Sequence, residues 1–332
     1  MCPYYSVLSA TQLIAEVERP FRSAPAKRRR FSFCNYIIKP GSDESKRRRA
    51  SLATALQKLM INPTISEWLN FIARWVHVFA GIMWVGTTYY FTWLDARLSE
   101  EELALANNEK AAQIWMVHSG GFYVVEKRKV PDELSRKLHW FRWEAATTWL
   151  SGLVLLIVVY YMGGGALIDR DVSDLSVGAA VAIGIGVLVF GWLLYDLMMI
   201  SLLGRYEKLF AVIAYALIVI VTYGLTRVLS GRAAYIHVGA MFGTIMAANV
   251  WMRILPAQRK MIEAIKAGKP PNQALAAQAK LRSKQNTFMA VPVVFLMISN
   301  HFGGNTTGGY DWVHVAVLVP LGWLAAKFIR RA

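Results

Sequence analysis

Seven apolar stretches follow one another from residue 67 to the end of the chain, and they constrain its fold more than any other feature. A helix needs about 20 apolar residues to cross a hydrocarbon core of about 30 Å. The stretches are close to this length and lie at 67–94, 143–162, 176–203, 209–229, 233–255, 286–302 and 312–329. The 332-residue sequence is 55% hydrophobic and only 17% charged, whereas soluble domains carry about 25% charged residues. No segment shows the alternation of a β-strand. We therefore predict an all-α protein, a polytopic helical membrane bundle of about seven transmembrane helices, rather than one large soluble helical core.

The first 60 residues have a different composition. They hold 12 Lys and Arg against four acidic residues, so they carry half of the formal net charge of +16. They lack the apolar region of a secretory signal, and blocks of like charge are typically solvated tails. We predict that residues 1–59 are a basic extension that is either absent from the mature protein or disordered, and that residues 60–332 form the membrane domain. The alternatives are a transit peptide and nucleic-acid binding, but we expect no nucleic-acid partner.

The Lys and Arg residues between the spans predict an orientation in the lipid bilayer. The links 95–142 and 253–285 carry eight each, whereas 163–175 carries one and 303–311 carries none. Cytoplasmic links are enriched in these residues. The C-terminus and both long links are therefore predicted to be cytoplasmic.

All six histidines lie in or beside the predicted membrane region: His77, His118, His139, His237, His301 and His314. Four of them fall in the outer half of the predicted bundle. Histidines at one depth on separate helices can ligate a haem b. We predict that His77 and His237 lie within one polar site, and His301 is a third candidate ligand.

Glycines beside two of these histidines support the haem hypothesis. Gly81 follows His77 by one turn, and Gly239 follows His237, so a porphyrin edge could approach the backbone there. Taken singly, each histidine is explained more simply as an interfacial or hydrogen-bonded residue, and each glycine as helix packing. The sequence has only two cysteines and no Cys-x-x-Cys-His motif. We therefore expect no metal-ion site and no covalently attached haem c in this chain.

Charged residues inside the spans are functional candidates by default. Arg74 lies one helical turn before His77, so both side chains are predicted to face the bundle interior. There the arginine can bind an anionic substrate or a haem propionate, which makes both residues catalytic candidates. The alternative is an ion pair between Arg74 and Asp196. Arg253 lies near a predicted span end, where a side chain that reaches toward the interface explains it.

The link between the first two spans is rich in aromatic residues and glycine. These residues occupy 115–123 and 138–144, and a solvated loop seldom contains so many of them. We predict an interfacial or re-entrant segment that turns at Gly120 and Gly121. His118 and His139 within it are further catalytic candidates.

Several of these segments resemble one known family. The stretch from Arg74 to Gly86, followed by Tyr90 to Asp95, resembles the opening of the membrane-bound, cytochrome c-linked urate oxidases. The resemblance continues through 115–123, 138–152, 237–249 with Pro256, and 291–301. It covers about residues 60–330. Within 283–286 the family usually has a histidine before the asparagine, where this sequence has Gln285.

The resemblance implies an integral membrane redox domain of the bacterial inner (plasma) membrane. Such a domain would oxidise urate or a related purine, a step of purine catabolism, and pass the electrons on. The family carries a cytochrome c domain beyond a further span, so for this sequence a separate c-type cytochrome is the expected partner. Two other functions fit the residues: a haem b electron-carrier subunit without its own substrate, and a transporter of a small organic anion.

Overall fold

The computed structural model describes residues 63–105, 112–128, 137–162, 166–301 and 311–330. The chain divides into two units, Met1–Leu59 and Met60–Ala332, and all described residues belong to the second. The predicted basic extension 1–59 lies outside the described residues and stays a prediction.

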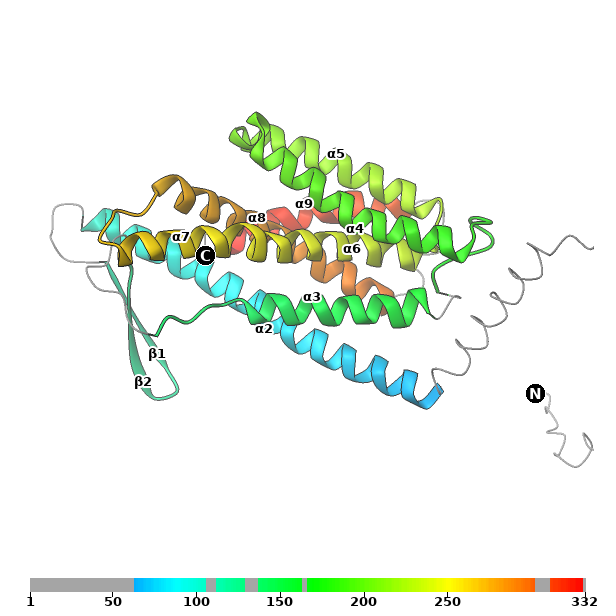
Figure 1. Cartoon of the computed structure of the whole chain (residues 1–332), viewed down its shortest axis with the longest axis horizontal. Helices are drawn as coiled ribbons and strands as arrows, with labels where there is room; N and C mark the ends of the chain where they lie inside the picture. The colour runs from blue at the N-terminus through cyan, green and yellow to red at the C-terminus, as the bar shows by residue number, and fades with distance from the viewer. Residues whose placement is uncertain (1–62, 106–111, 129–136, 163–165, 302–310, 331–332) are drawn as a thin grey trace, which may run out of the picture. The chain divides into compact units, whose positions relative to one another are not determined.

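The second unit is a bundle of long helices that run alternately in opposite directions (Figure 1). In chain order, its helices are α2 (Pro63–Ala104), α3 (Trp143–Leu155) with the π-helix η2 (Leu156–Tyr161), α4 (Val177–Ile200), the 3-10 turn η3 (Leu202–Arg205), α5 (Glu207–Thr226), α6 (Gly231–Ala248) with the π-helix η4 (Asn249–Ile254) and α7 (Leu255–Lys266), α8 (Gln273–Ile298) with the 3-10 turn η5 (Ser299–His301), and α9 (Asp311–Ile329). The all-α prediction is confirmed in its main architecture.

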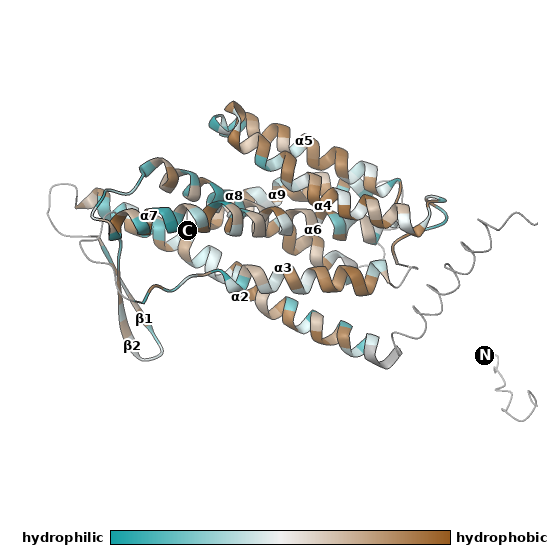
Figure 2. Ribbon diagram, in the orientation of Figure 1, coloured by the Kyte–Doolittle hydropathy of each residue, from teal (hydrophilic) through white to brown (hydrophobic). Residues whose placement is uncertain are grey.

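Six helical segments of the described residues are long and apolar enough to cross a membrane: Ser66–Ala104, Trp143–Tyr161, Val177–Ile200, Glu207–Thr226, Gly231–Lys266 and Asp311–Ile329. The sixth predicted span, 286–302, lies in α8, which does not qualify because its first half is polar. Figure 2 shows apolar residues along most of the bundle and hydrophilic residues at the ends of several helices.

Three helices extend well beyond the apolar stretches that predicted them. The first span continues to Ala104, the fifth to Lys266, and the sixth begins at Gln273 rather than at residue 286. The predicted link 253–285 is therefore largely helical. Hydropathy marks only the part of a helix that contacts lipid, whereas strong helix formers such as the Ala, Gln, Lys and Arg of 273–285 continue it into a polar environment.

A β-hairpin in the link after α2 contradicts the prediction that no strand is present. Strands β1 (Gln113–His118) and β2 (Gly121–Glu126) pair antiparallel, with Trp115 opposite Val124. The turn consists of Ser119 and Gly120, both with positive φ of 51° and 74°, as a two-residue hairpin loop requires. The predicted turn was thus displaced by one residue. Apolar residues on both faces of the hairpin hide the alternation of a strand in the sequence.

The base of the hairpin is attached to α2. On the face toward α2, Ile114 and Val125 pack against a small core that contains Leu94 and Leu98. The carboxylate of Asp95 pairs with two lysines, Lys127 after β2 and Lys280 on α8. Outside the spans, hydrogen bonds from the side chains of Arg128 and Gln113 lower the pKa of Glu126, which therefore stays ionised.

Helix α6 contains more fully buried residues than its neighbours and contributes many residues to the main hydrophobic core. Tyr235, His237 and Val238 on this helix are fully buried. Glycines on neighbouring helices allow the close approach: a Cβ added at Gly184 of α4 would lie 2.5 Å from Nε2 of His237. Contact between helices in lipid relies on such small residues.

We predict that Gly184→Ala destabilises the bundle by about 1–3 kcal/mol, the usual effect of overpacking a well-packed core. The new methyl group would overlap the His237 ring and the Tyr161 hydroxyl, which lie 2.5 and 2.6 Å from its position. Thermal unfolding of the detergent-purified protein measures the effect. Gly178→Ala is the matched control on the same helix, because nothing lies within 4 Å of a Cβ at Gly178. Equal melting temperatures for the two variants would contradict the packing assignment.

Candidate functional site

A buried network of charged and amide side chains joins α4, η4 and α8. Its centre is the carboxylate of Asp196 on α4. Arg282 on α8 donates from Nη2 to Oδ1 of Asp196 over 2.7 Å. Arg253 on η4 donates from Nε to the same oxygen over 2.9 Å and from Nη2 to the other carboxylate oxygen. One carboxylate thus neutralises part of the charge of two guanidinium groups.

Two asparagines extend the network away from the carboxylate. Arg282 donates from Nη1 to Oδ1 of Asn249 over 3.1 Å. The amide of Asn249 donates to Oδ1 of Asn286 over 2.9 Å and to the Tyr195 hydroxyl over 3.1 Å. Asn286 in turn donates to the backbone oxygen of Met246 over 3.0 Å. The guanidinium of Arg282 also lies 5.2 Å from the centre of the Tyr195 ring.

The local structure of three helices brings these residues together. Asn249 and Arg253 are four residues apart at the start and near the end of the π-helix η4, which interrupts the regular helix before Pro256. Arg282 and Asn286 are also four residues apart, so they share one face of α8. Short π segments inside α-helices occur frequently at functional sites.

The network carries a net positive charge in an otherwise apolar region. Its two arginines and one aspartate leave one unit of positive charge, and Asp196, Arg282, Asn249 and Asn286 are all buried. Arg253 differs, because its side chain is 43% exposed. Since buried charges without a role are expensive in a membrane protein, the network is the candidate functional site. Its chemistry suits a planar anion with several hydrogen-bonding groups, which Arg253 would contact first.

His77 and His237, which the sequence predicts to lie within one polar site, have different hydrogen-bond partners in the structure. Nδ1 of His77 lies 2.9 Å from the backbone oxygen of Thr148 and 3.2 Å from Oγ of Ser151, both on α3. His237 has Nδ1 2.7 Å from the backbone oxygen of Ala233 and Nε2 3.1 Å from the Tyr161 hydroxyl. The two histidines therefore occupy separate environments instead of the single polar site that the sequence predicted.

These two histidines do not fit an axial pair for a haem b. They contact the second span at positions ten residues apart, Ser151 and Tyr161, which corresponds to about 15 Å along a helix. Axial ligands must instead meet at one iron. Moreover, Nε2 of His237 is enclosed by Tyr161 and by the backbone of Gly184. No three His, Cys, Asp or Glu side chains gather as a metal-ion site in the part of the chain that the structure describes.

The glycines next to these histidines serve helix packing. A Cβ at Gly81 would make an ordinary contact of 3.9 Å with Thr148, and one at Gly239 would lie 2.9 Å from Cε of Met297 on α8. This is the simpler of the two interpretations that the sequence allowed for these glycines.

Arg74 does not face the bundle interior. Its side chain is exposed and donates to Oδ1 of Asn70, one turn earlier on α2, over 2.6 Å. The alternative ion pair between Arg74 and Asp196 is also wrong, because Asp196 is held by Arg253 and Arg282. His77 turns toward α3 instead, so the two residues do not share a site in the structure.

The remaining histidines lie at the surface of the described residues. His118 accepts or donates a hydrogen bond of 2.7 Å with Ser119 in the hairpin turn. His139 stacks its edge against Phe141, with ring centres 4.5 Å apart. His301 ends the turn η5, and His314 lies 3.3 Å from the Tyr235 hydroxyl. None of them contacts the network around Asp196.

The sequence pointed to only part of this network. Asp196, Asn249 and Arg253 stand out as polar residues within or near apolar spans, but Arg253 was interpreted as an interfacial side chain. Arg282 lies in the predicted link 253–285. Its spacing of four residues from Asn286, at the edge of an apolar run, is a signal that the two side chains share one helix face.

A family model described as urate oxidase N-terminal matches residues 63–332. The chain belongs to the urate oxidase N-terminal family. No curated protein and no solved structure matches it. The family match covers all the described helices, so the network of α4, η4 and α8 lies within the urate oxidase N-terminal domain.

We predict that Asp196→Asn destabilises this domain by about 3–5 kcal/mol, the usual effect of removing one partner from a buried ion pair. Both guanidinium groups would lose their counter-charge in an apolar environment. The free energy of unfolding in detergent measures the effect. Asp174→Asn is the matched control, because the Asp174 side chain is 98% exposed and lies 4.0 Å from Arg170. A similar stability of the two variants would contradict the central role of Asp196.

Proposed function

We propose that this chain is the membrane domain of a urate-oxidising system that passes electrons to a separate c-type cytochrome. The observation that carries the proposal is the urate oxidase N-terminal match over residues 63–332. The helices that are long and apolar enough to cross a membrane support a site of action in a lipid bilayer. The proposed substrate is urate, the proposed electron acceptor is a c-type cytochrome, and the proposed orientation has the C-terminus in the cytoplasm.

The network around Asp196 is the proposed substrate site. Urate is a planar anion near neutral pH, with carbonyl oxygens and ring N–H groups at its edge. Guanidinium groups bind such anions through a rigid fork of donors, and asparagine amides supply both donors and acceptors. The Arg253 side chain is 43% exposed. The aspartate and the two asparagines behind it fix the position of the arginine pair.

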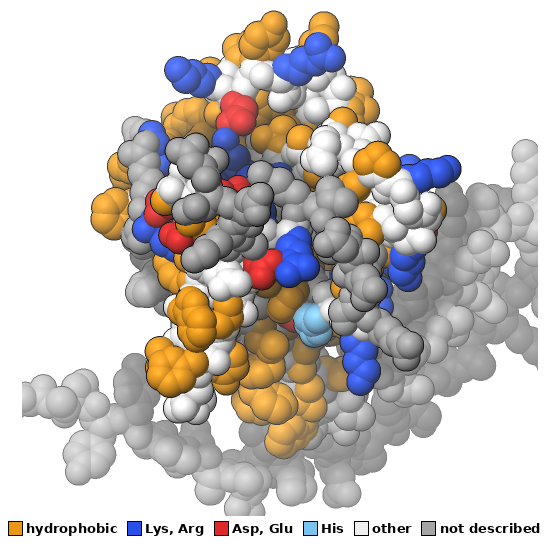
Figure 3. Space-filling model, turned by 90° about the vertical axis from the view of Figure 1, so that its left-hand side faces the viewer, with side chains coloured by type: hydrophobic (Ala, Val, Ile, Leu, Met, Phe, Trp, Pro, Cys, Tyr) orange, Lys and Arg blue, Asp and Glu red, His pale blue; other side chains and the backbone are white. Residues whose placement is uncertain are grey.

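The distribution of charge supports access to this site from the cytoplasm. Asp196 lies four residues before the end of α4 and pairs with Arg282 in the first half of α8. Figure 3 looks onto this end of the bundle and shows Lys and Arg side chains around its rim. Because basic residues mark the cytoplasmic side, this distribution supports the proposed orientation, in which the C-terminus lies in the cytoplasm of a bacterium.

The proposed reaction balances with a one-electron acceptor outside the chain. Urate loses two electrons and takes up a hydroxyl group from water, and two protons are released. Each electron reduces one c-type cytochrome. The residues of the network would bind and orient the anion during this step.

Membranes that contain the protein should consume urate when oxidised cytochrome c is added. Urate loss is followed by its ultraviolet absorbance and cytochrome reduction by the visible spectrum, with two cytochromes reduced for each urate. Membranes without the protein are the control. The proposal is wrong if urate stays unchanged with cytochrome c present and the protein folded.

A charge-conserving variant tests whether the network is the substrate site. Arg253→Lys keeps a positive charge beside Asp196 but removes the guanidinium fork. Because a hydrogen bond to a charged group contributes about 1.5–3 kcal/mol, we expect kcat/KM for urate to fall at least about tenfold. The exposed Arg259 on α7 provides the control, Arg259→Lys. Folded yield should stay near that of the unchanged protein for both variants, and equal kcat/KM values would contradict the assignment.

One observation favours a second function, transport of a small organic anion. The network lies where a membrane helix is interrupted by a π segment, and interrupted helices commonly form the binding sites of transporters. Proteoliposomes separate the two functions. Accumulation of intact labelled urate without cytochrome reduction would favour transport over oxidation.

A further inference from the structure

A large apolar cavity lies beside the proposed substrate site. Its volume is about 450 Å³, and α4, α5, α6, α8 and α9 all contribute to its wall. This is within the range of about 300–1,000 Å³ that is usual for small-molecule pockets. Small side chains on α5, Ala211 and Ala214, leave part of this space open.

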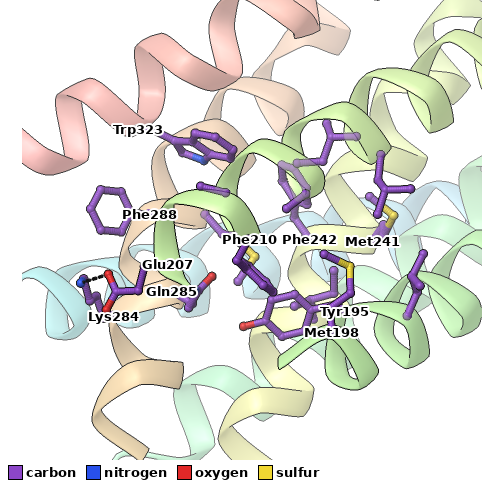
Figure 4. Close-up of a pocket in the computed structure, with 18 of the residues that line it drawn as sticks. Tyr195, Met198, Glu207, Phe210, Met241, Phe242, Lys284, Gln285, Phe288 and Trp323 are labelled. Atoms are coloured by element: carbon purple, nitrogen blue, oxygen red, sulfur yellow. Dashed lines mark hydrogen bonds and ion pairs between the residues drawn. The ribbon is translucent and has the colours of Figure 1, made fainter. Parts of the chain in front are cut away.

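Most of the cavity wall is formed by apolar side chains. Methionines from three helices line it, Met198 of α4, Met241 of α6 and Met289 of α8, together with aromatic rings that include Trp323. Figure 4 shows Met198, Met241 and Trp323 around a common space. Methionine adapts its shape to an apolar ligand. The hydroxyl of Tyr195, which also lines the cavity, is already partnered by Asn249.

The cavity is elongated along α5. Its lining on this helix runs from Glu207 to Val221, a separation of 14 residues and therefore about 21 Å. A compact polar molecule such as a purine would leave most of this length empty. A flexible hydrocarbon chain matches both the length and the composition of the wall.

The lining also contains charged residues at the basic end of the bundle. The lining there contains three lysines, Lys208, Lys284 and Lys327, and one acidic residue, Glu207. Lys284 pairs with Glu207 over 2.5 Å, as Figure 4 shows. Within the described residues, Lys208 and Lys327 have no ion-pair partner, so this end of the cavity keeps two positive charges.

We propose that the cavity binds an anionic amphiphile, with one acyl chain along α5 and a carboxylate or phosphate headgroup between Lys208 and Lys327. The apolar wall accepts the chain, and the two lysines select against neutral headgroups. Basic pockets between membrane helices on the cytoplasmic side bind anionic lipid headgroups. The inference goes beyond urate oxidation and does not depend on it.

Binding of labelled oleate to the full chain in phosphatidylcholine nanodiscs tests the proposal. Labelled phosphatidylglycerol is the second probe, and oleyl alcohol is the neutral comparison for oleate. We expect saturable binding of at least one anionic probe with one site per chain. Binding of oleate indicates a free carboxylate as the headgroup, and binding of phosphatidylglycerol indicates a phospholipid phosphate.

Two variants separate the roles of charge and cavity. Lys208→Gln with Lys327→Gln should raise the Kd of the bound anionic probe at least tenfold. Lys260→Gln with Lys269→Gln is the matched control, because it removes two exposed lysines from the same end that do not line the cavity. Ala214→Phe should abolish binding of the same probe by filling the cavity from α5.

The outcomes distinguish a specific binding site from non-specific electrostatic attraction to a basic surface. A loss of affinity in the Lys208 and Lys327 variant, with an unchanged Kd in the control, supports the proposal. Equal losses in both lysine variants overturn it, as does oleyl alcohol binding as tightly as oleate, or absence of saturable binding by both anionic probes. Urate oxidation is measured separately, so failure of that activity leaves this test intact.

Discussion

In lipid, a polar group must find its partner inside the protein, and this requirement determines the arrangement of the centre of the bundle. The carboxylate of Asp196 holds the guanidinium groups of Arg253 and Arg282, which belong to helices far apart in sequence. Because each unpaired charge would be unfavourable in hydrocarbon, α4, η4 and α8 are bound to one another at this point. The amides of Asn249 and Asn286 complete the same network. The interaction that fixes the helices is therefore also the one that presents Arg253 at the edge of the bundle.

Glycines have the opposite role, since they allow contact where no charge is present. Gly184 admits the His237 ring between α4 and α6, and Gly152 on α3 admits the His77 ring of α2. Each imidazole is thereby used in packing and in a hydrogen bond to a backbone oxygen of its own or a neighbouring helix. The sequence gives only the depth of each histidine within its membrane span. The two histidines have different neighbours in the structure, so depth alone predicted a shared site poorly.

Much of the bundle was predictable, because hydropathy reports directly on contact with lipid. It located the apolar parts of the helices, but it did not reveal that α8 begins at Gln273 or that α2 reaches Ala104, since helix propensity rather than hydropathy controls those extensions. The hairpin was missed because both of its faces carry apolar residues, Trp115 outward and Ile114 toward α2. Arg282 was missed for a different reason: its partners lie 86 and 33 residues away, and one sequence does not show which helix faces meet.

Tyr195 connects the two parts of the molecule that have distinct chemistry. Its ring lines the apolar cavity, whereas its hydroxyl accepts a hydrogen bond from Asn249 and its face lies under Arg282. The ring also packs against Trp192 and Phe210, with ring centres 6.1 and 5.9 Å away. The cavity and the proposed substrate site therefore share one side chain, and the positive charges of both sites lie at the same end of the bundle.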